Sequence, residues 1–227
     1  MAFQLIESTK SVNGLPIEAY KNDVSGDKYF YLIAGVHGDE VEGIHVLKEL
    51  FAWLKVNPQP YPIVVIPCLN VDGHKAGTRV NANGVDLNRN LPSTKWTPEA
   101  REPKYFPGTK PLSEPENQFL VSLFNKYPPK FIISMHSWYP VLNFNGNCVE
   151  VAEFLATFNN YPLDGDLEGH PTPGSLGELG PETYHAPVLT MEFAVLAEGI
   201  TLEKIWNENK EGLQKLFTTG LINSFKK

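Results

Sequence analysis

The sequence predicts an α/β fold in which buried strands alternate with helices. Four short apolar runs rich in β-branched and aromatic residues are typical of strands covered on both faces, and they lie at 29–34, 63–66, 131–135 and 188–191. Stretches of helical period separate these runs. The chain has 227 residues, of which 42% are hydrophobic and 20% charged, and it contains no repeat or linker. We therefore expect residues 1–227 to form a single domain, with helices on both faces of the sheet.

The helical stretches have recognisable beginnings and apolar faces. Residues 41–54 repeat large aliphatic and aromatic side chains every three to four positions. A second helix is expected to begin near Ser113, which can cap it, with Pro115 in the first turn and Glu116 completing a capping box. A last helix is predicted over residues 201–217.

Charge and hydropathy narrow the class of partner. The net charge is −7 and the sequence has no basic stripe, which argues against nucleic acid. No apolar run reaches the length of about 18 residues that a membrane span needs. The N-terminal residues lack a charged segment followed by an apolar one, so we expect a cytoplasmic protein. The sequence gives no prediction of oligomeric state.

Candidate metal ligands follow the predicted strands. His37 and His136 come directly after two of them, Glu40 stands three residues after His37, and Glu192 ends the last strand. Ligand sites in open α/β sheets gather at the carboxyl ends of strands, and two histidines with one glutamate are the ligand set of a catalytic zinc. The spacing alone leaves open a second interpretation, in which the histidines are hydrogen-bonded structural residues.

The segment 71–111 is too long and irregular for a simple connection, and such segments in compact domains tend to be functional. It contains Arg79 and Arg89 ten residues apart, with Asn88 beside the second. One arginine can clamp a carboxylate bidentately while the other stabilises an oxyanion. The alternative is a surface loop with solvated arginines.

Taken together, these stretches resemble the zinc carboxypeptidases of the M14 metallopeptidase family. The resemblance extends from about residue 37 to residue 193, through HGDE, NVDG, GTR, GVDLNRN, SEPE, MHSW and TMEF in that order. Within the family, GTRVNANGVDLNRN, PLSEPENQFL and PTPGSLGEL are most similar to the compact bacterial murein peptide amidases. Such enzymes cleave the γ-D-glutamyl–diaminopimelate bond of cell-wall peptides.

The resemblance implies a fold and a metal centre. The fold would be a mixed sheet of about eight strands flanked by helices. His37, Glu40 and His136 would hold one zinc ion per chain, and Glu192 would be the general base. An aspartoacylase-type N-acyl amino-acid deacylase has related zinc and DLNR elements and is the alternative enzyme. A third possibility is a catalytically inactive module that recognises peptide C-termini. The presence of all four residues, the three ligands and the base, argues against it.

The resemblance also implies which residues contact the substrate. Arg79 would stabilise the oxyanion, while Asn88 and Arg89 would hold the terminal carboxylate of a small peptide. NVDG here replaces the usual NPDG, and Leu91 replaces an aromatic residue. The first of these departures is a mild change in a turn.

The specificity pocket is the least determined part of the site. Ser175 and Leu176 match the family's pocket floor, and Gly169 or His170 occupies the place of a flexible tyrosine found in larger carboxypeptidases. Trp138 is expected to pack against other aromatic residues rather than to line the cleft.

Acidic residues near this pocket suggest the substrate. The segment 164–168 contains Asp164, Asp166 and Glu168, and Glu178 follows shortly after. An acidic wall could pair with the ammonium group at the far end of diaminopimelate. The same wall would accept a peptide ending in Lys or Arg, which is the alternative substrate, and a solvated acidic loop is the alternative structure.

Overall fold

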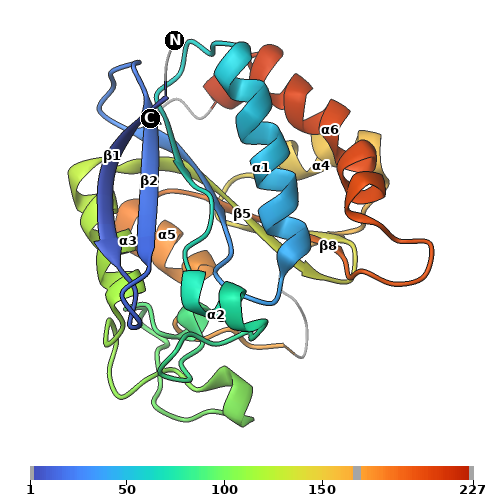
Figure 1. The fold of residues 1–227 in the computed structure, drawn as a ribbon. Helices are drawn as coiled ribbons and strands as arrows, with labels where there is room; N and C mark the ends of the chain where they lie inside the picture. The colour runs from blue at the N-terminus through green and yellow to red at the C-terminus, as the bar shows by residue number, and fades with distance from the viewer. Residues whose placement is uncertain (1–2, 166–169, 225–227) are drawn as a thin grey trace.

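The computed structural model describes residues 3–165 and 170–224, and a twisted mixed sheet runs through their centre (Figure 1). The eight strands lie in the order β1-β2-β4-β3-β5-β8-β6-β7. Strands β3, β4, β5 and β8 are parallel to one another, whereas β2 and β6 pair antiparallel with this central group. The strands are β1 (Phe3–Lys10), β2 (Pro16–Asn22), β3 (Tyr29–Ala34), β4 (Ile63–Ile66), β5 (Pro129–Trp138), β6 (Val141–Asn145), β7 (Leu163–Asp164) and β8 (Val188–Ala194).

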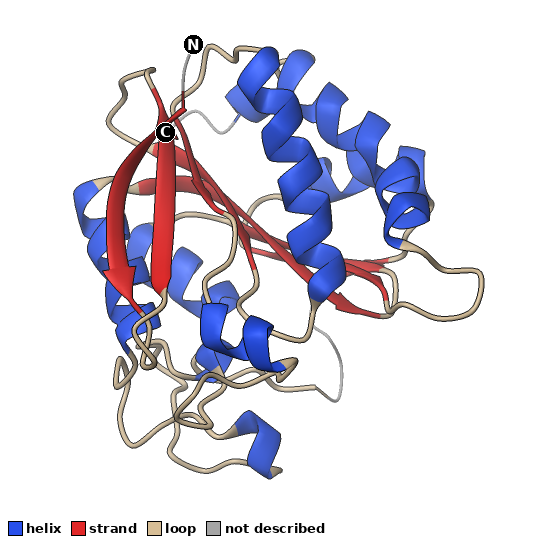
Figure 2. Ribbon diagram, viewed as in Figure 1, coloured by secondary structure: helices blue, strands red, loops and turns tan. Residues whose placement is uncertain are grey.

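Helices cover both faces of the sheet, as Figure 2 shows. One hydrophobic cluster joins one face of the sheet to α1, α4 and α6, and a second joins the other face to α3 and α5. The helices are α1 (Val41–Val56), α2 (Val71–Ala76), α3 (Pro115–Lys126), α4 (Val149–Asn159), α5 (Leu176–Tyr184) and α6 (Leu202–Thr218). The described residues thus form one three-layered domain.

The central strands are buried because they are apolar on both faces. Every residue of β3 and β4 is buried, as the unbroken apolar runs predicted. The parallel pairing of β5 with β8 sets His136 opposite Glu192, and that of β3 with β5 sets Ala34 opposite Met135. The carboxyl ends of β3, β5 and β8 therefore meet at one edge of the sheet.

The structure confirms the predicted fold class, the four predicted strands and the three predicted helices. The predicted cap of α3 is wrong. Its N-cap is Glu114, and the Ser113 hydroxyl donates to Glu114 Oε1 instead of closing the first turn.

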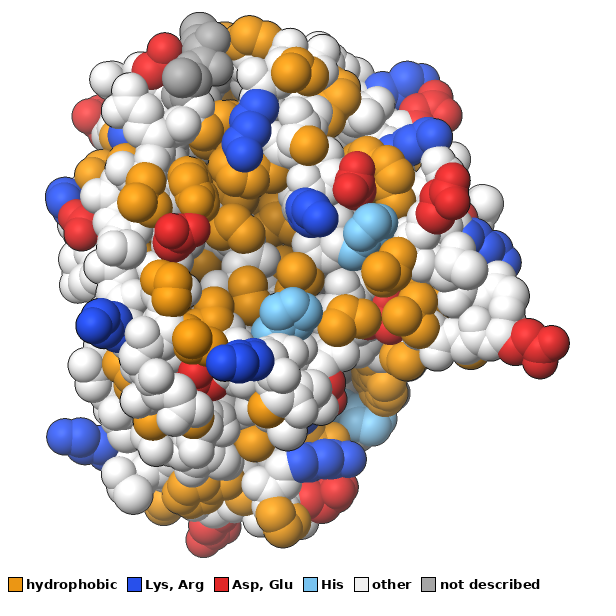
Figure 3. Space-filling model, viewed as in Figure 1, with side chains coloured by type: hydrophobic (Ala, Val, Ile, Leu, Met, Phe, Trp, Pro, Cys, Tyr) orange, Lys and Arg blue, Asp and Glu red, His pale blue; other side chains and the backbone are white. Residues whose placement is uncertain are grey.

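The surface carries charges of both signs. Figure 3 shows Lys and Arg side chains as separate spots among Asp and Glu on the face that it draws. Over the described residues, no helix is both long and apolar enough to cross a membrane.

Candidate active site

Three buried side chains converge where β3, α1 and β5 meet. His37 and Glu40 lie in the turn between β3 and α1, and His136 lies near the end of β5. One nitrogen or oxygen from each residue lies within 4.8 Å of the others. The helix can approach β5 this closely because residue 43 is glycine: a Cβ there would lie 2.6 Å from the Met135 carbonyl oxygen.

The spacing of these atoms is close to that of a metal site. Nδ1 of His37 lies 2.7 Å from Glu40 Oε1, Nδ1 of His136 lies 2.8 Å from Glu40 Oε2, and the two Nδ1 atoms are 3.2 Å apart. Ligand atoms of a tetrahedral zinc are about 3.3–3.6 Å apart for bonds of about 2.0–2.2 Å. A small outward movement of the side chains would therefore admit the ion, and the donor set fits zinc.

The outer nitrogens of both histidines have fixed partners. Nε2 of His37 lies 3.0 Å from Asp86 Oδ1, and Nε2 of His136 lies 2.9 Å from the Ser134 hydroxyl. Such contacts fix the ring orientation and direct Nδ1 toward the centre of the cluster. Asp86 was not singled out from the sequence, although it belongs to the GVDLNRN stretch.

At the buried carboxylates Glu40 and Asp86, positively charged neighbours lower the pKa by more than burial raises it. Burial alone would raise the pKa of Glu40, but His37 and His136 hold that pKa well below its usual range. The pKa of the buried Asp86 is also lowered, because His37 and Arg79 outweigh its desolvation. Two ionised carboxylates beside two histidines favour a divalent cation.

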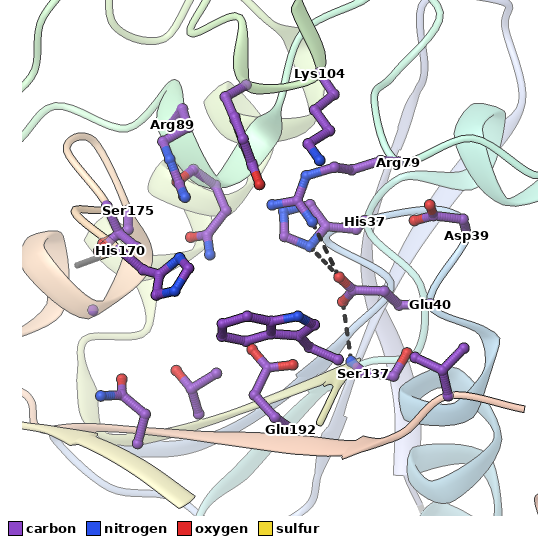
Figure 4. Close-up of a pocket in the computed structure, with 18 of the residues that line it drawn as sticks. His37, Asp39, Glu40, Arg79, Arg89, Lys104, Ser137, His170, Ser175 and Glu192 are labelled. Carbon is purple, nitrogen blue, oxygen red and sulfur yellow. Dashed lines mark hydrogen bonds and ion pairs between the residues drawn. The ribbon is translucent and has the colours of Figure 1, made fainter. Parts of the chain in front are cut away.

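Glu192 faces the cluster from the neighbouring strand (Figure 4). Burial raises the pKa of its carboxyl to about 7. Its Oε2 is buried and has no hydrogen-bond partner among the described residues. A carboxylate oxygen left without a partner beside a candidate metal centre is suited to a water molecule or a substrate.

Arg79 lies above Glu40 on the loop side of the cleft. Its Nη1 is 3.3 Å from Glu40 Oε1, and its Nε and Nη2 are 3.1 and 3.0 Å from Asp86 Oδ2. These contacts hold the guanidinium group at the metal cluster. Figure 4 shows Arg79 on this side and Arg89 farther along the cleft.

Arg89 and Asn88 are held by the start of α5. The Asn88 Oδ1 accepts a hydrogen bond from Leu176 N, which leaves Nδ2 of that amide available to donate into the cleft. Gly174 has a φ of 73°, and a Cβ there would lie 2.3 Å from the Arg89 carbonyl oxygen. Only glycine allows this close approach of the two segments.

One cleft of about 360 Å³ is lined by His37, Glu40, Arg79, Asn88, Arg89 and Glu192. Beyond the candidate ligands and arginines, its wall includes residues that the sequence did not reveal, namely Asp39, Arg101, Lys104, Tyr105, Asn143, Asn145, Gly177 and Thr190. The pairing of Asn143 with Thr190 places them on the same face of the sheet as Glu192. A polar residue at every second position of a strand was the available signal for Asn143 and Asn145.

The structure separates the residues expected at the specificity pocket. Ser175 and His170 line the cleft, whereas the Leu176 side chain is buried in the apolar cluster under α5. The packing interpretation of Trp138 is confirmed only in part: its ring packs against that of Tyr139, with centroids 4.4 Å apart, but the side chain also lines the cleft. This side chain is 45% exposed, and its ring centroid lies 4.9 Å from that of His170. Gly169 lies outside the described residues.

The predicted acidic wall is not formed by Glu178. Its carboxylate accepts hydrogen bonds from the Ser93 hydroxyl and Gly174 N, and it lies 3.6 Å from Lys95 Nζ. It thus supports the loop behind the cleft. Asp164 is not among the lining residues. Asp166 and Glu168 lie outside the described residues.

Known proteins resemble this chain in sequence and in fold. The sequence pattern of the zinc carboxypeptidase family, peptidase M14, matches residues 2–167. Murein peptide amidase A of Vibrio campbellii is 31% identical over 206 residues, covering 86% of this chain and 81% of that protein. The corresponding protein of Escherichia coli K12 is 30% identical, covering 86% of this chain and 83% of its own length.

Solved structures agree with the sequence comparisons. The crystal structure of murein-tripeptide amidase from Escherichia coli O157 superposes with a TM-score of 0.76 at 26% identity, over 95% of this chain and 91% of that one. Carboxypeptidase A of Helicoverpa armigera superposes with a TM-score of 0.80 at 14% identity, over 98% and 69% of the two chains, and shares the fold. The chain therefore belongs to the zinc carboxypeptidase family, whose members depend on zinc, and is a hydrolase.

Proposed function

We propose that the protein hydrolyses the amide bond between the γ-carboxyl group of D-glutamate and diaminopimelate in murein peptides, using one zinc ion per chain. The observation that carries the proposal is that Asn88 and Arg89 line the same cleft as His37 and Glu40, which form a cluster with His136. The similarity to proteins named as murein peptide amidases supports the substrate class.

His37, Glu40 and His136 would hold the zinc ion, and their outer partners Asp86 and Ser134 would orient the rings. When bound there, a zinc ion would supply Lewis-acid chemistry, polarising the scissile carbonyl group and lowering the pKa of water to about 7. The remaining steps depend on side chains of the chain itself.

Glu192 would take the proton of the attacking water through its unpartnered Oε2 and later deliver it to the leaving amine. Arg79 would donate to the oxygen on which negative charge develops, since Asp86 and Glu40 already hold its guanidinium at the cluster. Both groups lie at the cluster before substrate binds, which reduces the reorganisation that the reaction needs.

Arg89 and the Nδ2 of Asn88 would bind the terminal carboxylate of the substrate. Because Arg89 lies farther along the cleft than Arg79, this contact would place the amide one residue from the C-terminus at the metal cluster. The enzyme would in this way remove a single residue from the end of the peptide.

Neutral polar groups in the cleft favour diaminopimelate over lysine or arginine. Asn143, Asn145 and Thr190 line it on the sheet face that carries Glu192, while Glu178 points elsewhere. Amide groups both donate and accept hydrogen bonds, so they can pair with the ammonium and the carboxylate at the far end of diaminopimelate. A lysine side chain offers only an ammonium group, for which an acidic wall would be the better partner.

Incubation of zinc-loaded protein with L-Ala-γ-D-Glu-diaminopimelate tests the proposal. We expect mass spectrometry to detect free diaminopimelate and the dipeptide L-Ala-D-Glu. The comparison substrates are a lysine-terminated analogue and a set of N-acetyl amino acids. Faster hydrolysis of the N-acetyl compounds would indicate a deacylase, and a preference for apolar C-terminal residues would reject the proposed substrate.

A cytoplasmic location remains a prediction, which fractionation of producing cells would test. A role in recycling of cell-wall peptides also remains a prediction. The mixture of charges in Figure 3 supports a small substrate rather than nucleic acid.

A further inference from the structure

Arginine is used in this chain only at the cleft. The sequence contains 16 lysines and three arginines, and Arg79, Arg89 and Arg101 all line the cleft. Lysine supplies the positive charge elsewhere. A guanidinium group is planar and matches a carboxylate with two parallel hydrogen bonds, which an ammonium group does not. This distribution indicates that the cleft recognises carboxylates.

The cations of the cleft gather around one aromatic ring. The Cζ atoms of Arg79, Arg89 and Arg101 lie 5.3, 5.5 and 4.4 Å from the ring centroid of Tyr105, and Lys104 Nζ lies 5.0 Å from it. Burial would raise the pKa of Tyr105, but hydrogen bonds and positive charge from Arg101 and Lys104 outweigh it and lower that pKa. The potential around the ring is therefore positive.

Only part of this charge is balanced within the protein. Arg79 contacts Glu40 and Asp86. Lys104 contacts Glu102 at 3.3 Å, but both side chains are 55% exposed, and such pairs contribute little. Across the ranges that the structure describes, neither Arg89 nor Arg101 has a carboxylate oxygen within 4.0 Å.

The carboxylates of diaminopimelate are not enough to match these groups. The proposed function places the terminal carboxylate at Arg89 and the far carboxylate of diaminopimelate at the amides of Asn143 and Asn145, which leaves Arg101 without an anion. Arg101 and Lys104 are both exposed at the mouth of the cleft, where a ligand can reach them. Figure 4 shows Lys104 beside Arg79, on the side of the metal cluster and away from Arg89. Lys104 therefore lies on the acyl side of the scissile bond, and Arg101 lies against the same Tyr105 ring as Lys104.

We propose that Arg101 and Lys104 bind a further carboxylate of the substrate, the free α-carboxylate of the γ-linked glutamate whose side-chain carbonyl is attacked. The inference rests on the proposed function and deepens it. The α-carboxylate carbon is four bonds from the scissile carbonyl carbon, about 5 Å away when extended. With the carbonyl oxygen at Arg79, the carboxylate falls among the cations around Tyr105.

This contact would select the type of bond that is cleaved. An ordinary α-linked peptide has a neutral backbone amide next to the scissile carbonyl group and no carboxylate at its Cα atom. A γ-linked glutamate always presents that carboxylate. Arg101 and Lys104 would thus be specificity-determining residues that distinguish γ-glutamyl bonds from α-peptide bonds.

Two tripeptides that differ in one group test the inference. They are L-Ala-γ-D-Glu-diaminopimelate and the same peptide with a carboxamide in place of the glutamate α-carboxylate. We expect kcat/KM of the unmodified protein to be at least about 10-fold higher for the free carboxylate, because the lost hydrogen bonds are to charged groups. In a protein with both Arg101→Gln and Lys104→Gln, the ratio should fall to within about twofold of one.

Lys110→Gln is the matched control, because Lys110 is an exposed cation of the same segment that does not line the cleft. It should keep the ratio of the unmodified protein. Equal cleavage of both peptides by the unmodified protein, or a preference that survives in the double variant, would overturn this inference and leave the proposed function standing. If neither γ-linked peptide is cleaved, both this inference and the proposed function are wrong. Where the double variant folds poorly, the ratio measured on the unmodified protein still tests whether the α-carboxylate is recognised, and equal cleavage would overturn the inference.

Discussion

The two sides of the cleft differ in how they are held. On the sheet side, His136 and Glu192 lie on neighbouring strands, and pairing of β5 with β8 sets them opposite each other. On the loop side, Arg79, Arg89 and Arg101 lie in a segment with little regular structure. The sheet side cannot shift without unpairing strands, whereas the loop side can change in sequence while the sheet stays intact. The comparison indicates that the sheet side fixes the metal cluster and Glu192, while the loop side supplies the arginines that we propose to contact substrate carboxylates.

The loop side is nevertheless ordered, through asparagine side chains. Nδ2 of Asn90 donates to the carbonyl oxygens of Pro107 and Lys110 and to the Ser113 hydroxyl. Nδ2 of Asn81 donates to Glu114 Oε2 at 2.7 Å. These buried side-chain hydrogen bonds, instead of backbone pairing between strands, hold the loop that carries the arginines.

The largest effect is expected from removal of a metal ligand on the sheet side. His37→Ala should abolish zinc binding together with turnover, because a two-ligand site holds the ion much more weakly. Elemental analysis of the purified protein and the rate of peptide hydrolysis measure the two effects. His45→Ala, on α1 outside the cleft, is the control and should keep both. Full activity in a metal-free variant would contradict the metal centre.

Removal of the base should affect chemistry alone. Glu192→Gln keeps the size and polarity of the side chain but cannot accept the proton, so turnover should fall by ~10²-fold or more while zinc content persists. The control is Glu198→Gln, an exposed carboxylate beyond the same strand. Turnover within a few-fold of the unmodified protein would show that another group is the base.

Arg79 lies on the loop side but contacts the metal cluster. Its replacement therefore tests whether a loop-side residue acts in the chemical step or only in substrate binding. Arg79→Ala should lower kcat by about 10²–10³-fold, the loss typical of one oxyanion donor, with a smaller change in KM. Zinc content is measured in parallel, because Arg79 also contacts Glu40. A raised KM with unchanged kcat would assign Arg79 to substrate binding instead.

The sequence predicted the sheet side better than the loop side. Continuous apolar runs revealed β3 and β4, since both faces of these strands are buried. Strand β1 was missed because a bulge between Leu5 and Glu7 interrupts its alternation. Strand β6 was missed because Asn143 and Asn145 interrupt its apolar pattern.

The site residues on the sheet side were likewise easier to predict from the sequence than those on the loop side. His37, Glu40 and His136 could be predicted because each follows a strand or begins a helix, where the topology makes them converge. The burial of Leu176 could not, since a helix of nine residues can present either face to the cleft. Arg101 and Tyr105 stand far from any strand, and only the folded loop brings them to Arg79.

The division between the two sides is tested most directly by substrate affinity in a protein with strongly reduced turnover. In the Glu192→Gln background, isothermal titration calorimetry gives the dissociation constant of L-Ala-γ-D-Glu-diaminopimelate with little hydrolysis during the measurement. Adding Arg89→Ala should raise it about 10- to 100-fold, because the terminal carboxylate loses its charged partner. Adding Lys110→Ala should leave it unchanged. A dissociation constant unaffected by Arg89→Ala would contradict the claim that the loop side holds the substrate.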